Sequence, residues 1–272
     1  MPELPEVETT RRGIAAPMLG NTVSEIRVHN SQLRWPVPVG DLQKALPGRI
    51  INSVSRRGKY LLIDCGTGHL IIHLGMSGSL RILDQGTPLA KHDHVEILFT
   101  DGKVLRMHDP RRFGAVLWTA DAPAMHALLV ALGPEPLNDD FNGEYLFSKT
   151  RKRRCTIKSL VMDSHVVVGV GNIYASESLF RAGIRPGKSA ARLTRRSCTD
   201  LASAIKQVLA DAIEVGGTTL RDFTRADGQA GYFSLSLSVY GRAGESCKVC
   251  GETIKHRQIA QRSSFYCPQC QK

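Results

Sequence analysis

The stretch YLLIDCGTGHLIIHLGMSGSLRIL at residues 60–83 decides the fold of the first half of this chain. It contains three short apolar or alternating runs, Tyr60–Ile63, Leu70–Leu74 and Ser79–Leu83, which are separated by glycine-rich turns. Short runs bounded by such turns are typical of antiparallel strands. The stretch therefore predicts an antiparallel sheet.

The same spacing continues on both sides of this stretch. Further runs are found at Ser24–Val28, Val95–Phe99, Val104–Met107 and Ala115–Trp118. One run in roughly every ten residues is typical of a β-sandwich or barrel, which we expect over residues 21–118. A short helix is expected before it, at the N-terminus.

The second half is predicted to be helical, so the whole chain is expected to be an α+β protein. A helical period begins near Met125–Leu132 and stops at Gly133-Pro134. The clearest helix is expected over about Arg195–Val215, with Thr194 as its N-cap and Gly216-Gly217 as its stop signal.

Charge narrows the class of partner. The chain has 272 residues, 42% of them hydrophobic, and a formal net charge of +11. This excess of positive charge attracts polyanions, and DNA-binding, ribosomal and membrane-surface proteins all fit it. We expect a cytoplasmic protein because neither a membrane-spanning apolar stretch nor a secretion signal is found. Nothing in the motifs indicates an oligomer, so a monomer is expected.

Four of the seven cysteines lie in two close pairs near the C-terminus. They are Cys247, Cys250, Cys267 and Cys270. Two Cys-x-x-Cys pairs supply four thiolates for tetrahedral zinc, and a site with four protein ligands has no open position for catalysis. The sequence therefore predicts one structural zinc ion. The residues between the pairs, 255–264, carry three cationic side chains and are expected to contact nucleic-acid phosphates.

The chain opens with Met1-Pro2-Glu3-Leu4-Pro5-Glu6. Removal of Met1 would free the Pro2 nitrogen, a secondary amine that can attack an electrophilic carbon and form an iminium ion. Glu3 and Glu6 could then transfer protons beside it. Taken alone, these residues favour a simpler explanation: a frayed terminus, followed by a helix with Pro5 in its first turn.

Two kinds of surface feature remain open on the residues alone. The run Lys149–Arg154 holds five positive charges in six positions and is either a solvated face or a phosphate contact. Met76 and Phe113 stand in apparent loops, the latter directly after Arg111-Arg112. Such side chains either pack inward or insert between stacked bases.

Together these motifs closely resemble the bacterial formamidopyrimidine-DNA glycosylases, the oxidised-purine branch of the Fpg/endonuclease VIII family. The match runs nearly from end to end. It comprises PELPEVET at 2–9, RRGKY at 56–60, IIHLGMSGSLRIL at 71–83, KHDH at 91–94, DPRRFG at 109–114, LGPEPL at 132–137, GVGNIYASE at 169–177, GGTTLRDF at 216–223 and the closing cysteine pairs. The open alternatives above are then decided in favour of catalysis and DNA contact.

The resemblance implies a division into three domains. Residues 1–133 would form a catalytic domain, an N-terminal helix with a β-sandwich. Residues 134–237 would form a helix–two-turns–helix DNA-binding domain, which includes a lesion-recognition loop at 217–233. Residues 238–272 would form the zinc finger.

The resemblance also implies the reaction. The chain would be both a glycosylase and an AP lyase that acts on double-stranded DNA containing 8-oxoguanine or formamidopyrimidines. Pro2 would attack the sugar C1′, with Glu3 as general acid/base and Glu6 orienting it. Lys59 would donate a proton or contact a phosphate, and Arg262 would bind phosphate. β-Elimination and δ-elimination would then cut the strand.

Further DNA contacts are implied by the same resemblance. Met76, Arg111 and Phe113 would fill the space left by the flipped nucleotide. The expected contacts to the DNA backbone are His92, Arg153 or Arg154, Lys158 and Asn172. Arg221 lies in the lesion-recognition loop, at a position where a lysine is expected.

Overall fold

The computed structural model describes residues 2–217 and 237–272. By its internal contacts the chain divides into two compact units. Within the described residues, unit 1 comprises 2–130 and Gly216-Gly217, and unit 2 comprises 131–215 and 237–272. The division into three domains stays a prediction.

Unit 1 contains two four-stranded antiparallel sheets, which confirms the predicted sandwich. The first sheet has the order β1 (Val23–Val28), β6 (Asp93–Phe99), β7 (Lys103–His108) and β5 (Ser79–Asp84). The second has the order β2 (Ser53–Arg57), β3 (Tyr60–Asp64), β4 (His69–His73) and β8 (Ala115–Thr119). Strand β2 was not predicted, because Val54 is its only apolar residue. It lies at the edge of the second sheet, where one buried side chain suffices.

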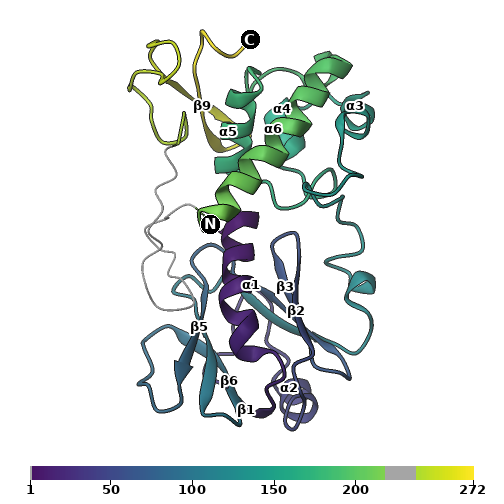
Figure 1. Ribbon diagram of the computed structural model, residues 1–272, viewed down its shortest axis with the longest axis vertical. Coiled ribbons are helices and arrows are strands. Elements are labelled where there is room, and N and C mark those ends of the chain that lie inside the picture. The colour runs from purple at the N-terminus through teal and green to yellow at the C-terminus, as the bar shows by residue number, and fades with distance from the viewer. Residues whose placement is uncertain (1, 218–236) are drawn as a thin grey trace. The chain divides into compact units, whose positions relative to one another are not determined.

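Helix α1 (Leu4–Met18) packs against β2, β3 and β5, as Figure 1 shows within unit 1. Its side chains at Val7, Ile14 and Met18 are buried in the core between the sheets. Their spacing places them on one face of the helix. A second, shorter helix, α2 (Val39–Ala45), contributes Leu42 to the same core.

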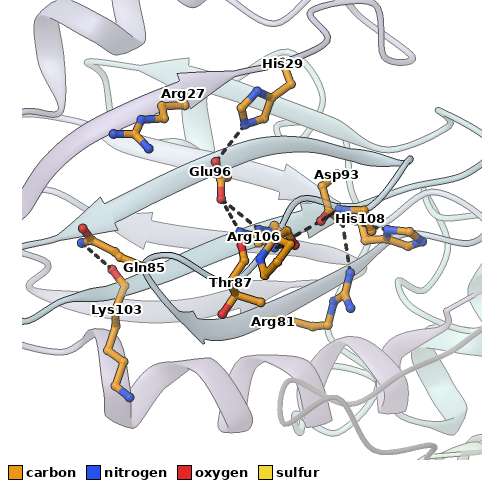
Figure 2. Close-up of polar contacts among 12 residues, drawn as sticks. Arg27, His29, Arg81, Gln85, Thr87, Asp93, Glu96, Lys103, Arg106 and His108 are labelled. Atoms are coloured by element: carbon orange, nitrogen blue, oxygen red, sulfur yellow. Dashed lines mark hydrogen bonds and ion pairs between the residues drawn. The ribbon is translucent and has the colours of Figure 1, made fainter.

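The first sheet of unit 1 contains a buried polar network (Figure 2). The Arg106 guanidinium is buried between two carboxylates, with Nη2 2.7 Å from Glu96 Oε1 and Nη1 3.4 Å from Asp93 Oδ2. His29 Nε2 lies 2.8 Å from the second oxygen of Glu96, and His108 Nδ1 lies 2.8 Å from Asp93 Oδ1. Each buried charge therefore has a partner of opposite charge, which ties β6 to β7 through side chains as well as backbone.

Unit 2 is built mainly of helices. They are α3 (Gly143–Thr150), α4 (Ile157–Val161), α5 (Asn172–Arg181), the single 3₁₀ turn η2 (Ala190–Arg192) and α6 (Arg195–Glu214). The prediction for α6 is confirmed, including its N-cap, since the Thr194 side chain accepts a hydrogen bond from the Ser197 N–H. Helix α6 packs against α3 and α5, and a hairpin of β9 (Lys255–Ile259) and β10 (Arg262–Tyr266) packs on α5.

The helix predicted near Met125–Leu132 is wrong. The chain forms only the 3₁₀ turn η1 (Pro123–Met125), followed by turns without further helix. Leu129 is buried, but Met125 and Val130 are 72% and 62% exposed, so most of the expected apolar stripe is not packed against another surface. A short helix without such packing is not stable on its own. No helix in the described ranges is long and apolar enough to cross a membrane.

Candidate active site

The start of helix α1 holds the first candidate residues, and both Pro2 and Glu3 are buried. Glu3 is the N-cap of the helix, and its backbone N–H donates to Glu6 Oε2 at 2.8 Å. Glu6 is itself fully buried. This bond satisfies a backbone N–H that has no backbone partner within the helix, and it fixes the backbone next to Pro2. The structure thus brings the two predicted carboxylates together beside Pro2.

Lys59 lies in the tight turn between β2 and β3, next to Gly58, whose φ is +57°. Close by, His73 at the end of β4 faces Tyr60, with ring centroids 4.8 Å apart. Burial, with the positive charges of Lys59 and Arg34, lowers the pKa of His73 to about 4. His73 Nδ1 accepts a hydrogen bond from the Gly75 N–H at 2.9 Å, so the neutral ring is held in one tautomer.

Sequence reasoning missed His73, because its place in an apolar run indicates only a strand.

The low pKa of His73 predicts that the folded protein is sensitive to acid. Between pH 6.5 and 4 the unfolded chain binds a proton at this ring while the folded protein does not, so stability is full above pH 6.5 and falls towards pH 4. In His73→Asn the side-chain oxygen can still accept a hydrogen bond from the Gly75 N–H. Between pH 6.5 and 4 we expect the free energy of unfolding of this variant to fall by about 1–2 kcal/mol less than that of the unaltered protein. Urea unfolding at several pH values measures the difference. Parallel stability curves for the two proteins would contradict it.

Two loops of unit 1 carry the residues predicted to enter the base stack. The Met76 loop (residues 75–78) joins β4 to β5, and the Arg111 loop (residues 109–114) joins β7 to β8. Met76 and Phe113 are 38% and 43% exposed, so neither packs inward. The Arg111 guanidinium lies 5.1 Å from the centre of the Phe113 ring, a distance suited to a cation–π contact.

In unit 2, a cavity of about 210 Å³ has Lys158 and Arg262 among its lining residues, together with Ala260 and Asp163. Lys158 is buried, and its Nζ donates to Ser263 O at 2.9 Å and to Ser264 Oγ at 2.8 Å. Helix α4 is therefore tied to the hairpin that carries Arg262, whose side chain is exposed. Both residues line the same cavity, Arg262 with an exposed side chain and Lys158 with its ammonium buried against the hairpin.

The turn before Arg262 is strained. Ala260 and Gln261 have φ values of +46° and +59°, the left-handed conformation that both central residues of a type I′ hairpin require. Asn and Gly are the usual residues there, and alanine has no side-chain group that favours it. Strain of this kind is found mainly at functional sites, where the surrounding structure enforces it.

Asn172 is the first residue of α5 and lies at the positive end of that helix. Its Nδ2 donates to the Tyr240 hydroxyl at 3.4 Å, and its buried Oδ1 has no hydrogen-bond partner within residues 2–217 and 237–272. Tyr240 was not predicted, since no motif includes it. Its backbone N–H is held by the Glu177 carboxylate at 2.9 Å, which fixes the tyrosine beside Asn172.

The four C-terminal cysteines converge as predicted, with all their Sγ atoms within 4.8 Å of one another. Cys247 and Cys270 Sγ are 3.9 Å apart, and Cys250 and Cys267 Sγ are 3.4 Å apart. Four sulfurs at about 2.3 Å from a tetrahedral zinc ion would be about 3.8 Å apart. The observed spacing therefore fits zinc.

The remaining predicted contacts are dispersed. His92 is partly buried in the turn just before β6, with its ring centroid 5.8 Å from that of His108. Arg153 and Arg154 are both exposed after α3. Arg221 and residues 218–233 of the predicted lesion-recognition loop lie outside the described residues.

Comparison with family models assigns most of the chain. Residues 1–116 match the formamidopyrimidine-DNA glycosylase N-terminal domain, and residues 132–224 match the H2TH domain of the same family. Residues 244–272 match a zinc finger found in FPG and IleRS. With this match, the four-cysteine cluster is the site of one structural zinc ion.

Individual proteins agree with the family models. The chain is 57% identical to the formamidopyrimidine-DNA glycosylase of Thioalkalivibrio sulfidiphilus, over 100% of both chains. Among solved structures, a Lactococcus lactis Fpg in complex with DNA containing an abasic site has a TM-score of 0.91, with 34% identity over 99% of each chain. MutM (FPG) from Thermus thermophilus has a TM-score of 0.89 and is 37% identical, over 99% of this chain and 98% of that one.

Proposed function

Because the chain belongs to the formamidopyrimidine-DNA glycosylase family, we propose that it excises 8-oxoguanine and formamidopyrimidines from double-stranded DNA and then cuts the strand. Its membership makes it a DNA repair glycosylase. The choice of lesion and the lyase step are the proposal. The observation that carries them is the buried Pro2-Glu3-Glu6 arrangement at the start of α1.

In the proposed reaction the Pro2 nitrogen, freed by removal of Met1, bonds to the sugar C1′ as the bond to the damaged base breaks. The base leaves with a proton. Glu3 acts as general acid/base at the opening sugar, and Glu6 holds Glu3 through the bond to its N–H. The Pro2 nitrogen attacks in its uncharged form, in which its lone pair is available to bond to C1′.

The resulting iminium ion then acts as an electron sink. Loss of a C2′ proton releases the phosphate on the 3′ side by β-elimination, and a second elimination releases the phosphate on the 5′ side. Lys59 donates a proton or contacts a phosphate near this site. Arg262, exposed on its strained hairpin, binds phosphate during the second elimination.

A duplex with one 8-oxoguanine opposite cytosine tests the sequence of steps. We expect a one-nucleotide gap with phosphate on both ends, and an intact strand would contradict the proposal.

The proposed DNA interface rests on charge and on the polar groups of both units. The net charge is +11, and the exposed Arg262 lines a cavity of unit 2. His92, Asn172 and one of Arg153 and Arg154 are proposed as further backbone contacts, and Arg221 as a contact to the damaged base. The protein is proposed to act as a monomer.

Salt should weaken this interface strongly. If about four to six phosphates are neutralised, the logarithm of the association constant should fall with that of salt concentration at a slope of about −4 to −5. Fluorescence anisotropy with a duplex containing a tetrahydrofuran abasic analogue measures the slope. Arg262→Gln should make it less steep by about one unit. A slope near zero for the unaltered protein would contradict an interface built on phosphate contacts.

A further inference from the structure

The Met76 loop and the Arg111 loop share one buried carboxylate. Asp109 is 0% exposed, and its Oδ1 accepts hydrogen bonds from Ser77 Oγ at 3.0 Å and from the Arg111 N–H at 3.3 Å. Its Oδ2 accepts from the Gly114 N–H at 2.7 Å. Asp109 therefore binds one loop through Ser77 and both ends of the other through the backbone.

The two loops are also in direct backbone contact. Gly75 has a φ of +65°, and a Cβ at this position would lie 2.3 Å from the Phe113 carbonyl carbon and 2.5 Å from the Gly114 nitrogen. A side chain there would force the loops apart. Gly75 and Asp109 thus fix the distance between Met76 and Phe113 from two sides.

The backbone of the Arg111 loop is held in a conformation that it would not adopt unaided. Arg112 has a φ of +56°, which an L-residue with a long side chain rarely takes. Its N–H donates to Asp109 O at 3.2 Å, and His94 Nε2 lies 2.8 Å from the same oxygen. The strain is therefore balanced by contacts that converge on Asp109.

We propose that Asp109 is a positioning residue that couples the two loops, so that Met76, Arg111 and Phe113 enter the DNA stack as one rigid unit. The inference rests on the proposed function, in which these three side chains replace the flipped nucleotide. Excision from a duplex then depends on Asp109. Cleavage at an abasic site in single-stranded DNA does not, because no opposite base has to be separated from a partner.

The test compares these two substrates under single-turnover conditions for Asp109→Asn, Ser77→Ala and Glu96→Gln. In Asp109→Asn an NH₂ group replaces one of the two carboxylate oxygens. This NH₂ group must face either the Gly114 N–H or the donors of Ser77 and Arg111, so at least one hydrogen bond is lost. Ser77→Ala removes only the link to the Met76 loop. Glu96→Gln is the matched control, because Glu96 is a buried carboxylate of the same unit that is bound to Arg106 and His29 (Figure 2).

For Asp109→Asn we expect the rate on 8-oxoguanine opposite cytosine to fall about 10- to 100-fold relative to the rate on single-stranded abasic DNA. Ser77→Ala should lower the same ratio about 3- to 10-fold, and Glu96→Gln should leave it unchanged even where its melting temperature falls equally. If Asp109→Asn does not fold, as judged by circular dichroism, the ratio of the two rates measured for Ser77→Ala decides whether the proposal holds.

Each outcome points to a different conclusion. An unchanged ratio in a folded Asp109→Asn, or in Ser77→Ala where that variant decides, would overturn the coupling role of Asp109. An equal fall in Glu96→Gln would also overturn it, because general loss of stability would then explain the effect. Failure of the unaltered protein to excise 8-oxoguanine would instead overturn the proposed function.

Discussion

Extending the mature N-terminus by one residue, so that the Pro2 nitrogen becomes an amide, should lower strand cleavage at 8-oxoguanine by about 1,000-fold or more. An amide nitrogen has no available lone pair and cannot form an iminium ion with the sugar. Because every later step proceeds through that ion, both base release and elimination should stop. Borohydride trapping on the lesion duplex, with the adduct mapped by mass spectrometry, measures the effect directly.

Two controls make this result specific to the amine. Pro2→Gly keeps a free amine, now a primary one, and should retain part of the activity, with a fall of about 10- to 100-fold. Binding to an uncleavable abasic analogue should remain within about threefold in the extended form, since the DNA-contacting surface of unit 2 is unaltered. Undiminished cleavage by the extended form would show that another side chain is the nucleophile.

Replacing Cys247 by serine should weaken binding to the abasic analogue by about 100-fold and remove the bound zinc. The finger has a very small core, formed by Val239, Cys247, Ile254 and Cys267. Such a core cannot hold a hairpin by itself, so metal binding supplies the folding free energy. Loss of zinc should release the hairpin that carries Arg262 and should expose the buried Lys158 ammonium that it covers.

Cys155→Ser is the matched control, because Cys155 is exposed and lies far along the sequence from the four ligands. It should keep one zinc ion per chain, as measured by mass spectrometry of the metal, and should bind DNA normally. Unchanged DNA affinity in a zinc-free Cys247→Ser protein would show that the finger contributes nothing to binding.

Local patterns in the sequence were sufficient for much of the fold. The strands of the sandwich and helix α6 follow from periodicity and turn residues, because each buries one regular face. The helix expected near Met125–Leu132 failed, since an apolar period predicts a helix only where another surface covers it. Strand β2 was missed because Val54 is its only apolar residue. Its pairing with β3 is made by backbone groups, which leave no periodic pattern in the sequence.

The candidate site shows the same division. The Pro2-Glu3 start and the cysteine pairs are contiguous motifs, so the sequence alone could propose their chemistry. His73 and Tyr240 acquire their neighbours only through tertiary contacts. Asp109 is part of a recognisable motif, yet its bond to Ser77 joins residues 32 positions apart and could not be predicted from spacing.

The Arg106 network limits how this sheet can be redesigned for thermal stability. Deleting Arg106 alone would leave the buried carboxylates of Asp93 and Glu96 without the cation that they share, and breaking a buried ion pair typically costs about 3–5 kcal/mol. Exchanging all three at once for hydrocarbon side chains of similar volume could instead be harmless or even beneficial. A library that samples these positions one at a time would thus discard every route to such a triple replacement, whereas combinatorial sampling would retain it.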